Sequence, residues 1–309
     1  MILEKLEKII SPIYMVGGSV RDEILSIEPK DYDFTTPKNP DQIENAIRKV
    51  GKKPYLIGKR FGTIGVKIDN HFVEITTFRT EKYKQGSRKP NVTFVSDITL
   101  DLSRRDFTIN AIAKHKNQYI DPFNGISDIK KQIIKTVGNA EERFNEDPLR
   151  MLRAARFSSQ LNFKIDEKIK YTTKKLSYKI LETSKERWVM EIDKLLLSNN
   201  PSLGLDFLAE TNLLNFIIPE LSIQYKQDFR ISTIWEKTKI LVKKSENILE
   251  NRWAALLKNI SKSIIYPTNK KQLQYFLLTK ELVQKISIYL KWSKKRTQTI
   301  IEILEEKYK

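Results

Sequence analysis

Two aspartates separated by one residue, Asp31 and Asp33, are the side chains in this sequence with the clearest chemistry. They lie in a short segment of strand-forming residues, and residues two apart on a strand point to the same face. Two converging carboxylates repel each other unless a cation lies between them. A hard divalent cation held by carboxylates and substrate phosphates meets that need, and Mg²⁺ fits best. Two solvated acids on an edge strand are the alternative.

A glycine turn precedes this pair in the sequence. The apolar segment 13–17 predicts a short strand that breaks at Gly17 and Gly18 into a helix, which carries Arg21 one turn in. Glycines allow a tight turn and leave backbone N–H groups open to a phosphate, which Arg21 could reach with its forked donors. Taken alone, this segment is better explained as an ordinary glycine turn.

Together, the motifs Gly17-Gly18-x-x-Arg21-Asp22 and Asp31-x-Asp33 resemble the opening motif of class II tRNA nucleotidyltransferases, the CCA-adding enzymes and bacterial poly(A) polymerases. The resemblance implies an α+β fold: a polymerase-β-like nucleotidyltransferase head, built from a mixed sheet with helices, followed by an all-helical neck, body and tail. We place the head at residues 1–137, the neck at 138–200, and a reduced body and tail for tRNA binding at 201–309.

A third acid, Glu74, interrupts an apolar strand predicted at 71–78, which follows another strand predicted at 61–68. The resembled family carries an acid at this position, so Glu74 is a candidate catalytic residue beside Asp31 and Asp33. A solvent-facing acid on a half-exposed strand is an equal alternative.

The segment 101–113 resembles the second motif of the family. We expect Arg104 and Arg105 at the start of a helix that Asp106 could cap. Cations are disfavoured at a helix start, so contact with a triphosphate would explain them. The resemblance assigns Arg105 to the incoming nucleotide and gives Asn110 a structural role. A surface ion-pair cluster is the alternative for the two arginines.

Local patterns between these motifs predict one loop and one helix. The polar stretch 79–91 is expected to be a loop, in the place of the flexible loop that, in the family, helps the active site switch from C to A addition. Its presence favours full CCA addition or terminal A addition. A helix is expected from Asn39 to about Val50, with Asp41 placed to cap it.

Asp147, Arg150, Arg153 and Arg156 recur every three residues in a predicted helix, so one face carries an acid and then three guanidinium groups. An aspartate accepts from an exocyclic amino group, which C and A both carry, and an arginine donates to a ring nitrogen or carbonyl. The segment resembles the fourth motif of the family. The resemblance implies that Asp147 and Arg150 read the base, while Arg153 and Arg156 join the nucleotide site near the triphosphate or ribose. For the arginines alone, an exposed basic stripe is the alternative.

Composition narrows the class of protein. With 309 residues, 30% of them charged and 40% hydrophobic, the chain has a globular balance and room for two or more domains. Its formal net charge of +18 indicates a polyanionic partner, nucleic acid before membrane, although a lysine-rich surface explains part of it. The absence of cysteine excludes disulfides and thiolate zinc sites, and only two histidines occur. The N-terminal segment predicts an amphipathic helix rather than a signal peptide, and no apolar run reaches membrane-spanning length, so we expect a cytoplasmic enzyme.

Three hypotheses follow from these residues. The leading one is template-independent transfer of C, C and A from CTP and ATP to the 3′ end of tRNA, with Gly18, Arg21 and Arg105 around the triphosphate. Asp31 and Asp33 would hold two Mg²⁺ ions, one favouring the 3′-hydroxyl as nucleophile and the other stabilising the departing pyrophosphate. The second is an A-adding enzyme or poly(A) polymerase. The third is a non-catalytic RNA-binding protein with an inactive transferase head. A monomer is favoured over an oligomer.

Overall fold

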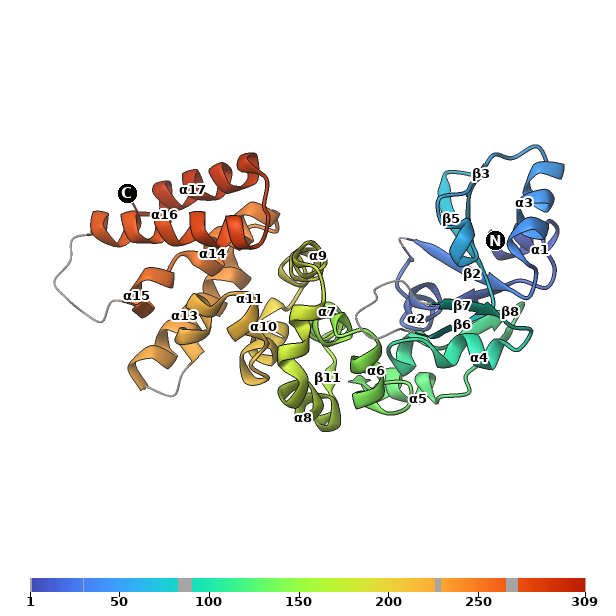
Figure 1. The fold of residues 1–309 in the computed structure, drawn as a ribbon, viewed down its shortest axis with the longest axis horizontal. Coiled ribbons are helices and arrows are strands. Elements are labelled where there is room, and N and C mark those ends of the chain that lie inside the picture. The colour runs from blue at the N-terminus through green and yellow to red at the C-terminus, as the bar shows by residue number, and fades with distance from the viewer. Residues whose placement is uncertain (1, 30, 83–90, 226–228, 265–271, 309) are drawn as a thin grey trace. The chain divides into compact units, whose positions relative to one another are not determined.

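The computed structural model describes residues 2–29, 31–82, 91–225, 229–264 and 272–308. The chain forms two compact units, Met1–Glu146 and Asp147–Lys309. The first contains the large β-sheet, and the second is almost entirely helical (Figure 1). The α+β fold predicted from the sequence, a mixed-sheet head followed by helices, is therefore confirmed. The first unit ends beyond the predicted head boundary at residue 137, and the division of the helices at residue 200 stays a prediction.

A seven-stranded mixed sheet forms the centre of the first unit. Its order is β3-β4-β5-β2-β1-β8-β9; β2 and β5 are parallel neighbours, and the other neighbouring pairs are antiparallel. Its strands are β1 (Tyr14–Val16), β2 (Tyr32–Thr36), β3 (Pro54–Tyr55), β4 (Thr63–Ile68), β5 (His71–Thr77), β8 (Ala113–His115) and β9 (Gln118–Ile120). The unit also contains β6 (Arg79–Lys82), β7 (Asn91–Phe94) and β10 (Ile133–Ile134).

One face of this sheet is packed and the other is open. Helix α3 packs against β3, β4 and β5 (Figure 1) and buries its Ile43. Because side chains alternate along a strand, Val73 and Ile75 of β5 are buried, whereas Phe72 and Glu74 are exposed on the opposite face. The helices of this unit are α1 (Ile2–Glu7), α2 (Gly18–Ile24), α3 (Pro40–Lys49), η1 (Lys59–Phe61), α4 (Ile98–Ser103), η2 (Thr108–Asn110), α5 (Gly125–Lys130) and α6 (Ala140–Glu146).

The predicted cap of α3 is wrong. Asn39, which directly precedes the helix, accepts a hydrogen bond from the Gln42 N–H at 2.9 Å, and the Gln42 side chain accepts from the Asn39 N–H at 3.0 Å. This reciprocal pair is a capping box. Asp41 lies in the first turn of the helix instead, where its carboxylate pairs with Lys59 at 2.7 Å.

Two further local expectations are corrected by the structure. The polar stretch 79–91 is not one continuous loop, because its two ends pair as β6 and β7; the residues between them, 83–90, lie outside the described part of the chain. Arg104 and Arg105 do not begin a helix. They follow the C-terminal end of α4, where the helix dipole favours cations, so no phosphate is needed to explain their presence.

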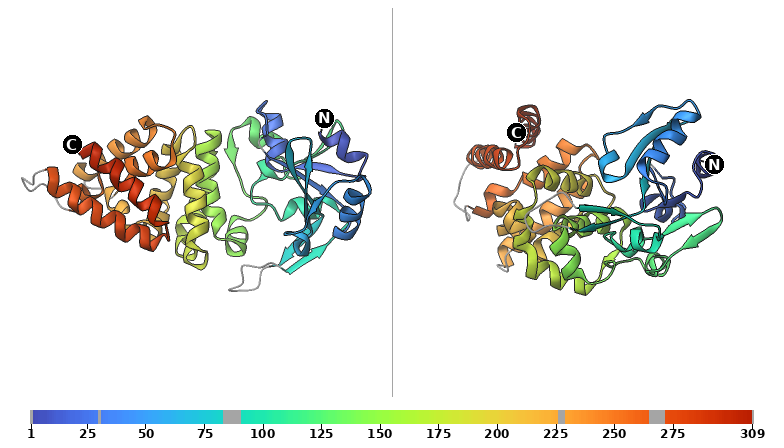
Figure 2. Two further views of the ribbon diagram at one scale, coloured as in Figure 1. Left: turned by 90° about the horizontal axis from the view of Figure 1, so that it is seen from above. Right: turned by 45° about the vertical axis from the view of Figure 1, so that its right-hand side comes forward.

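The second unit is a stack of helices. α7 packs against α9 and α10, and α16 and α17 lie side by side (Figure 2). Within the described ranges, no helix combines the length and the apolar character needed to span a membrane. The elements are α7 (Leu149–Leu161), β11 (Lys164–Ile165), α8 (Glu167–Leu176), η3 (Ser177–Glu182), α9 (Lys185–Leu196), α10 (Pro201–Glu210), α11 (Leu213–Ile217), α12 (Pro219–Ser222), η4 (Ile223–Tyr225), α13 (Phe229–Lys244), α14 (Leu249–Leu257), α15 (Ile260–Ile264), α16 (Gln272–Tyr289) and α17 (Lys294–Tyr308).

Gly204 lets α10 approach α7 closely. Its backbone N–H donates to the Ser159 hydroxyl at 2.9 Å. A Cβ atom at this position would lie 2.6 Å from the Ala155 carbonyl oxygen and 2.6 Å from a methyl carbon of Leu195. These distances are too short for carbon, so a larger residue would push the helices apart.

Gly204→Ala is expected to lower the free energy of unfolding of the second unit by roughly 1–3 kcal/mol, because the added methyl group overpacks this helix contact. All four tryptophans of the chain lie between residues 188 and 292, so urea unfolding followed by tryptophan fluorescence reports on this unit. Ser202→Ala, on the same helix, is the matched control and should change the value by less than about 0.5 kcal/mol. Equal values for the two variants would contradict the close packing described above.

Candidate active site

Gly17 forms the sharp turn that brings the candidate site together. Its backbone has a φ of 70°, a conformation that residues with a side chain rarely adopt. A Cβ atom here would lie 2.9 Å from the Arg105 Nη1 atom and 3.8 Å from the Asp33 Oδ2 atom. The glycine therefore leaves room for a guanidinium group and a carboxylate to meet beside it. Gly18 follows as the first residue of α2.

Ser19 fixes the start of the strand that carries the two aspartates. Its buried hydroxyl donates to the Asp31 carbonyl at 3.0 Å and accepts from the Asp33 N–H at 3.0 Å. One side chain thus ties α2 to both residues. Sequence reasoning did not single out Ser19; its only signal is its position directly after the glycine pair.

Asp33 and Glu74 lie side by side on the open face of the sheet, and Asp31 directly precedes β2. Because β2 and β5 are parallel neighbours, Asp33 lies directly beside Glu74 in the register. The protein atoms around its carboxyl raise the pKa of Asp33 by desolvation, and the Asp31 carboxylate raises it further, although Arg105 opposes them. The pKa of Glu74 is also raised, first by desolvation and then by the charges of Asp33 and Asp31. A neighbouring carboxylate therefore disfavours the charged form of both Asp33 and Glu74.

This electrostatic arrangement fits a cation site. Carboxylates whose charged forms are disfavoured by desolvation and by neighbouring carboxylates are stabilised by a cation, and carboxylate oxygen is the ligand that hard divalent metals prefer. In the part of the chain that the structure describes, no group of three or more His, Cys, Asp or Glu side chains is close enough to hold a metal ion. The roles of Asp31, Asp33 and Glu74 as metal or catalytic residues stay predictions.

Arg105 is held in place by Asp101, a residue that sequence reasoning did not select. The fully buried Asp101 carboxylate pairs with Arg105 at 3.3 Å and with Arg104 at 2.9 Å, and it accepts from the Arg79 N–H at 3.2 Å. Burial alone would raise the pKa of Asp101, but the guanidinium groups of Arg105 and Arg104 hold it below its ordinary value. Among the described residues, the buried Nε of Arg105 has no hydrogen-bond partner.

The same ion pairs connect this site to the β6–β7 ladder. Glu81 of β6 accepts from Arg79 at 2.7 Å and from Arg104 at 2.8 Å. Arg79 also donates to the Phe61 carbonyl. Asp101 and Glu81 therefore share Arg104, and the base of the ladder is joined to the segment that carries Arg105.

Arg21 lies one turn into α2, as predicted, and its side chain is held by protein groups. It is buried and donates to the Asp22 carboxylate at 2.7 Å and to the Asn110 side-chain oxygen at 2.7 Å. Asn110 in turn donates to Asp106 at 3.1 Å, in agreement with its expected structural role. These contacts place Arg21 in the framework beneath the glycine turn, and its predicted contact with phosphate stays a prediction.

In the second unit, Asp147 lies at the N-terminus of α7. Its carboxylate accepts from the Leu149 N–H at 3.1 Å, as expected of a cap, and pairs with Arg187 of α9 at 2.7 Å. Arg187 lies in the first turn of α9. Its contact orients Asp147 through a charge-assisted hydrogen bond.

The arginines of α7 are not a solvated stripe. Arg150 and Arg156 are buried, and Arg153 is partly buried. Arg156 pairs with the buried Glu191 of α9 at 2.9 Å, and its guanidinium carbon lies 4.1 Å from the centre of the Phe157 ring. The exposed-stripe alternative is therefore wrong, while the predicted nucleotide contacts of these arginines stay predictions.

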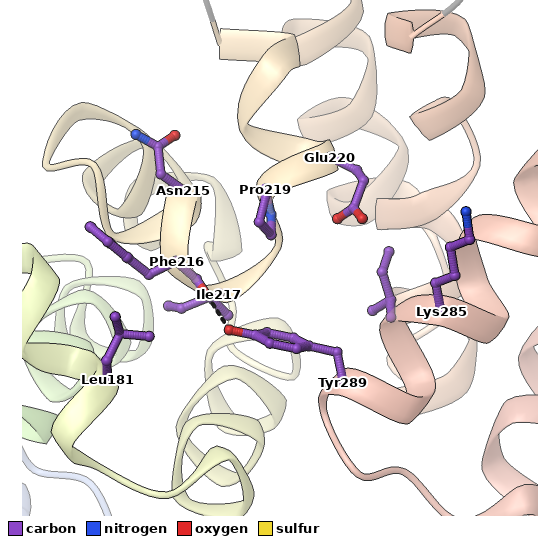
Figure 3. A pocket seen from close by; sticks show the side chains of 9 residues that line it. Leu181, Asn215, Phe216, Ile217, Pro219, Glu220, Lys285 and Tyr289 are labelled. Carbon is purple, nitrogen blue, oxygen red and sulfur yellow. Dashed lines mark hydrogen bonds between the residues drawn. The ribbon is translucent and has the colours of Figure 1, made fainter.

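A separate cavity of about 320 Å³ lies between η3, α11, α12 and α16 (Figure 3). The Tyr289 hydroxyl donates to the Phe216 carbonyl at 2.9 Å in its wall, and Glu220 and Lys285 are its charged side chains. Burial and then the Glu220 charge raise the pKa of Tyr289. None of the site residues predicted from the sequence lines this cavity.

Comparison with protein families gives two matches. A family described as the Poly A polymerase head domain matches residues 13–135. A family described as the probable RNA and SrmB-binding site of polymerase A matches residues 162–224.

Comparison with curated proteins and solved structures gives CCA-adding enzymes. The chain is 33% identical over 315 residues to the CCA-adding enzyme of Staphylococcus epidermidis, and the match covers 92% of this chain and 76% of the relative. It is 40% identical over 267 residues to the CCA-adding enzyme of Lactococcus lactis subsp. cremoris, and this match covers 84% of this chain and 63% of the relative. The chain spans from 53% to 76% of the length of such relatives. The crystal structure of the Bacillus stearothermophilus CCA-adding enzyme in complex with CTP is similar at a TM-score of 0.66 and 28% identity, covering 99% of this chain and 80% of that one.

Asp101→Asn is expected to destabilise the first unit by roughly 1–3 kcal/mol at neutral pH, because it removes the charge that pairs with two largely buried guanidinium groups. The folded-state pKa of Asp101 is depressed, so its stabilisation is complete above the unfolded-state pKa, near 3.8, and is lost as pH falls through the folded-state pKa. The difference between wild type and variant should therefore shrink in acid. Urea unfolding followed by circular dichroism at neutral and acid pH measures it.

Asp97→Asn is the matched control for this variant. The Asp97 side chain caps the same helix by accepting from the Thr99 N–H at 2.7 Å, and asparagine caps a helix about as well as aspartate. Its stability should stay within about 0.5 kcal/mol of wild type. A penalty for Asp101→Asn that is the same at both pH values would contradict the ionic role of Asp101.

Proposed function

The chain belongs to the class II tRNA nucleotidyltransferase family, which contains the CCA-adding enzymes and bacterial poly(A) polymerases, and on this premise we propose that it adds C, C and A to the 3′ end of tRNA from CTP and ATP. The resemblance in motifs and the names of the relatives support this substrate set. The proposal includes a cytoplasmic enzyme that acts as a monomer. The net charge of +18 suits a polyanionic substrate such as tRNA.

The observation that carries the proposal is the juxtaposition at Gly17. There the Arg105 guanidinium and the Asp33 carboxylate meet at a glycine turn, with Glu74 beside Asp33 in the sheet register. A nucleoside triphosphate needs cations and backbone N–H groups at its phosphates, and a transferring phosphoryl group needs carboxylate-held metal beside them. We assign Gly18, Arg21 and Arg105 to the triphosphate.

We propose that Asp31 and Asp33 hold Mg²⁺, with Glu74 as the third catalytic carboxylate. When bound, the metal would supply charge stabilisation for the 3′-hydroxyl nucleophile and the departing pyrophosphate. The chain contributes the positioning: Ser19 fixes the backbone of both aspartates, and Asp101 fixes Arg105. Holding the reactants in place without reorganisation lowers the barrier for a transfer that needs no covalent intermediate.

We propose that the base of the incoming nucleotide is read in the second unit. Asp147 would accept from the exocyclic amino group shared by C and A, and Arg150 would donate to the ring. Arg187 supports this role because it fixes the orientation of the Asp147 carboxylate. We assign Arg153 and Arg156 to the same nucleotide site. An A-adding enzyme or poly(A) polymerase is the second candidate, since both C and A present the amino group.

Asp33→Ala should reduce nucleotide incorporation by at least about 100-fold, because it removes a carboxylate at the reacting phosphate. Binding of tRNA should stay intact, because the substitution removes no contact to the body of the RNA. Incorporation of labelled CTP and a filter-binding assay with tRNA measure the two properties. Asp69→Ala, at the β4–β5 turn of the same sheet, is the control that keeps activity. Full turnover by the Asp33 variant would refute the metal assignment, and loss of both properties would indicate misfolding instead.

Sequencing the products formed on tRNA that ends before CCA distinguishes the hypotheses. With CTP alone we expect addition of two C residues, and with CTP and ATP a complete CCA end. An A-adding enzyme would instead incorporate A without C, and a poly(A) polymerase would form a long A tract. Strong tRNA retention without any incorporation, in Mg²⁺ and all nucleotides, would favour a non-catalytic RNA-binding protein.

A further inference from the structure

Two exposed aromatic side chains lie on the open face of the sheet. Tyr55 of β3 and Phe72 of β5 remain 42% and 50% exposed, and their ring centres are 5.4 Å apart in an edge-to-face arrangement. Contact between water and an apolar ring is unfavourable, so large exposed aromatic side chains in a monomer call for an explanation. Neither belongs to a motif that the sequence singled out.

The sheet register connects these rings to the carboxylates. Tyr55 pairs with Gly65, Gly65 pairs with Glu74, and Glu74 pairs with Asp33, so one row crosses four strands on the same face. Phe72 precedes Glu74 by two residues on β5, which puts its side chain about 7 Å along the same face. The aromatic pair therefore borders the candidate active site directly.

Gly65 leaves room for the tip of the Phe72 ring. A Cβ atom at this glycine would be 2.5 Å from the Phe72 Cζ atom, so any side chain there would lift the ring. Lys67 stands directly opposite Phe72 in the β4–β5 register and is exposed on the same face. Two aromatic faces with a neighbouring cation are the combination by which proteins bind single-stranded nucleic acid.

We propose that Tyr55 and Phe72 form a stacking platform for the unpaired bases at the 3′ end of the RNA acceptor, and so present its 3′-hydroxyl to the carboxylates. This inference rests on the proposed function. The terminal base of the acceptor changes after every addition, so a contact that holds it has to tolerate any base. Stacking meets this requirement because every base has a π-face, whereas hydrogen-bond readout does not. Lys67 would contact the phosphate backbone beside the platform.

The kinetic test compares the double variant Tyr55→Ala/Phe72→Ala with wild type on a tRNA acceptor minihelix that lacks CCA. We expect its KM for the RNA to rise about 10-fold, with the KM for CTP unchanged, because loss of stacking weakens only the acceptor. The variant Tyr55→Phe/Phe72→Tyr keeps both rings and should restore the wild-type KM.

Tyr119→Ala is the matched control. Tyr119 is equally exposed, at 42%, but lies in β9 at the opposite edge of the same sheet. Its KM for the RNA should equal that of wild type. An unchanged KM in the double alanine variant would overturn the platform, as would an equal rise in the Tyr119 variant, and either result would leave a protein-docking role for the aromatic patch.

A binding measurement without nucleotide separates the platform from the proposed function. The minihelix carries 2-aminopurine as its 3′-terminal base, whose fluorescence is quenched by stacking. Wild type at saturating concentration should quench it more than the double alanine variant does, and quenching that is equal in the two proteins overturns the platform. Quenching by wild type together with no CTP incorporation would refute the proposed function and retain the platform as an RNA-binding surface.

Discussion

The close approach of Asp33 and Glu74 on the open sheet face is the constraint on which the candidate site depends. Parallel pairing of β2 and β5 sets Asp33 beside Glu74, and the fold keeps them together although desolvation and like charge disfavour both ionised forms. A fold under selection for stability alone would separate such groups or pair each with a cation. Carboxylates that a rigid sheet holds close together, at a cost in electrostatic free energy, are typical of functional sites where a bound group supplies the missing positive charge.

Cations are brought to this face by a buried anion rather than by the carboxylates themselves. Asp101 holds Arg104 and Arg105 and is itself inaccessible to solvent, so it cannot compete for a ligand. The arrangement separates two tasks. Asp101 and Glu81 fix the guanidinium groups from behind, and the outer surface of Arg105 stays available beside Gly17.

Local sequence periodicity predicted the parts of the site that lie on strands. The apolar alternation around Glu74 is a two-residue pattern that β5 preserves, whereas β2 begins at Tyr32, so only Asp33 of the predicted aspartate pair lies on a strand. The position of Arg105 was misjudged because α4 ends at Ser103, and Asp106 accepts from its own neighbour, the Phe107 N–H, and from Asn110 rather than capping a helix.

Long-range pairings were beyond the reach of the sequence. Arg187 is separated from Asp147 by 40 residues, and no local pattern announces that the two will meet. The same holds for Arg156 and Glu191, which pair between two helices and are both buried. The row that joins Tyr55 to the carboxylates also depends on strand order, which residue spacing alone does not specify.

The crowding at Gly17 also bears on how freely this protein can evolve. Gly51 has a nearly identical φ of 71°, and no described atom beyond its chain neighbours lies within 4 Å of a Cβ built there, so asparagine, which tolerates positive φ, meets no steric obstacle. At Gly17 the same exchange would collide with the Arg105 guanidinium. Gly17 is therefore constrained both by its backbone angle and by its neighbours, whereas the described surroundings of Gly51 leave room for a side chain.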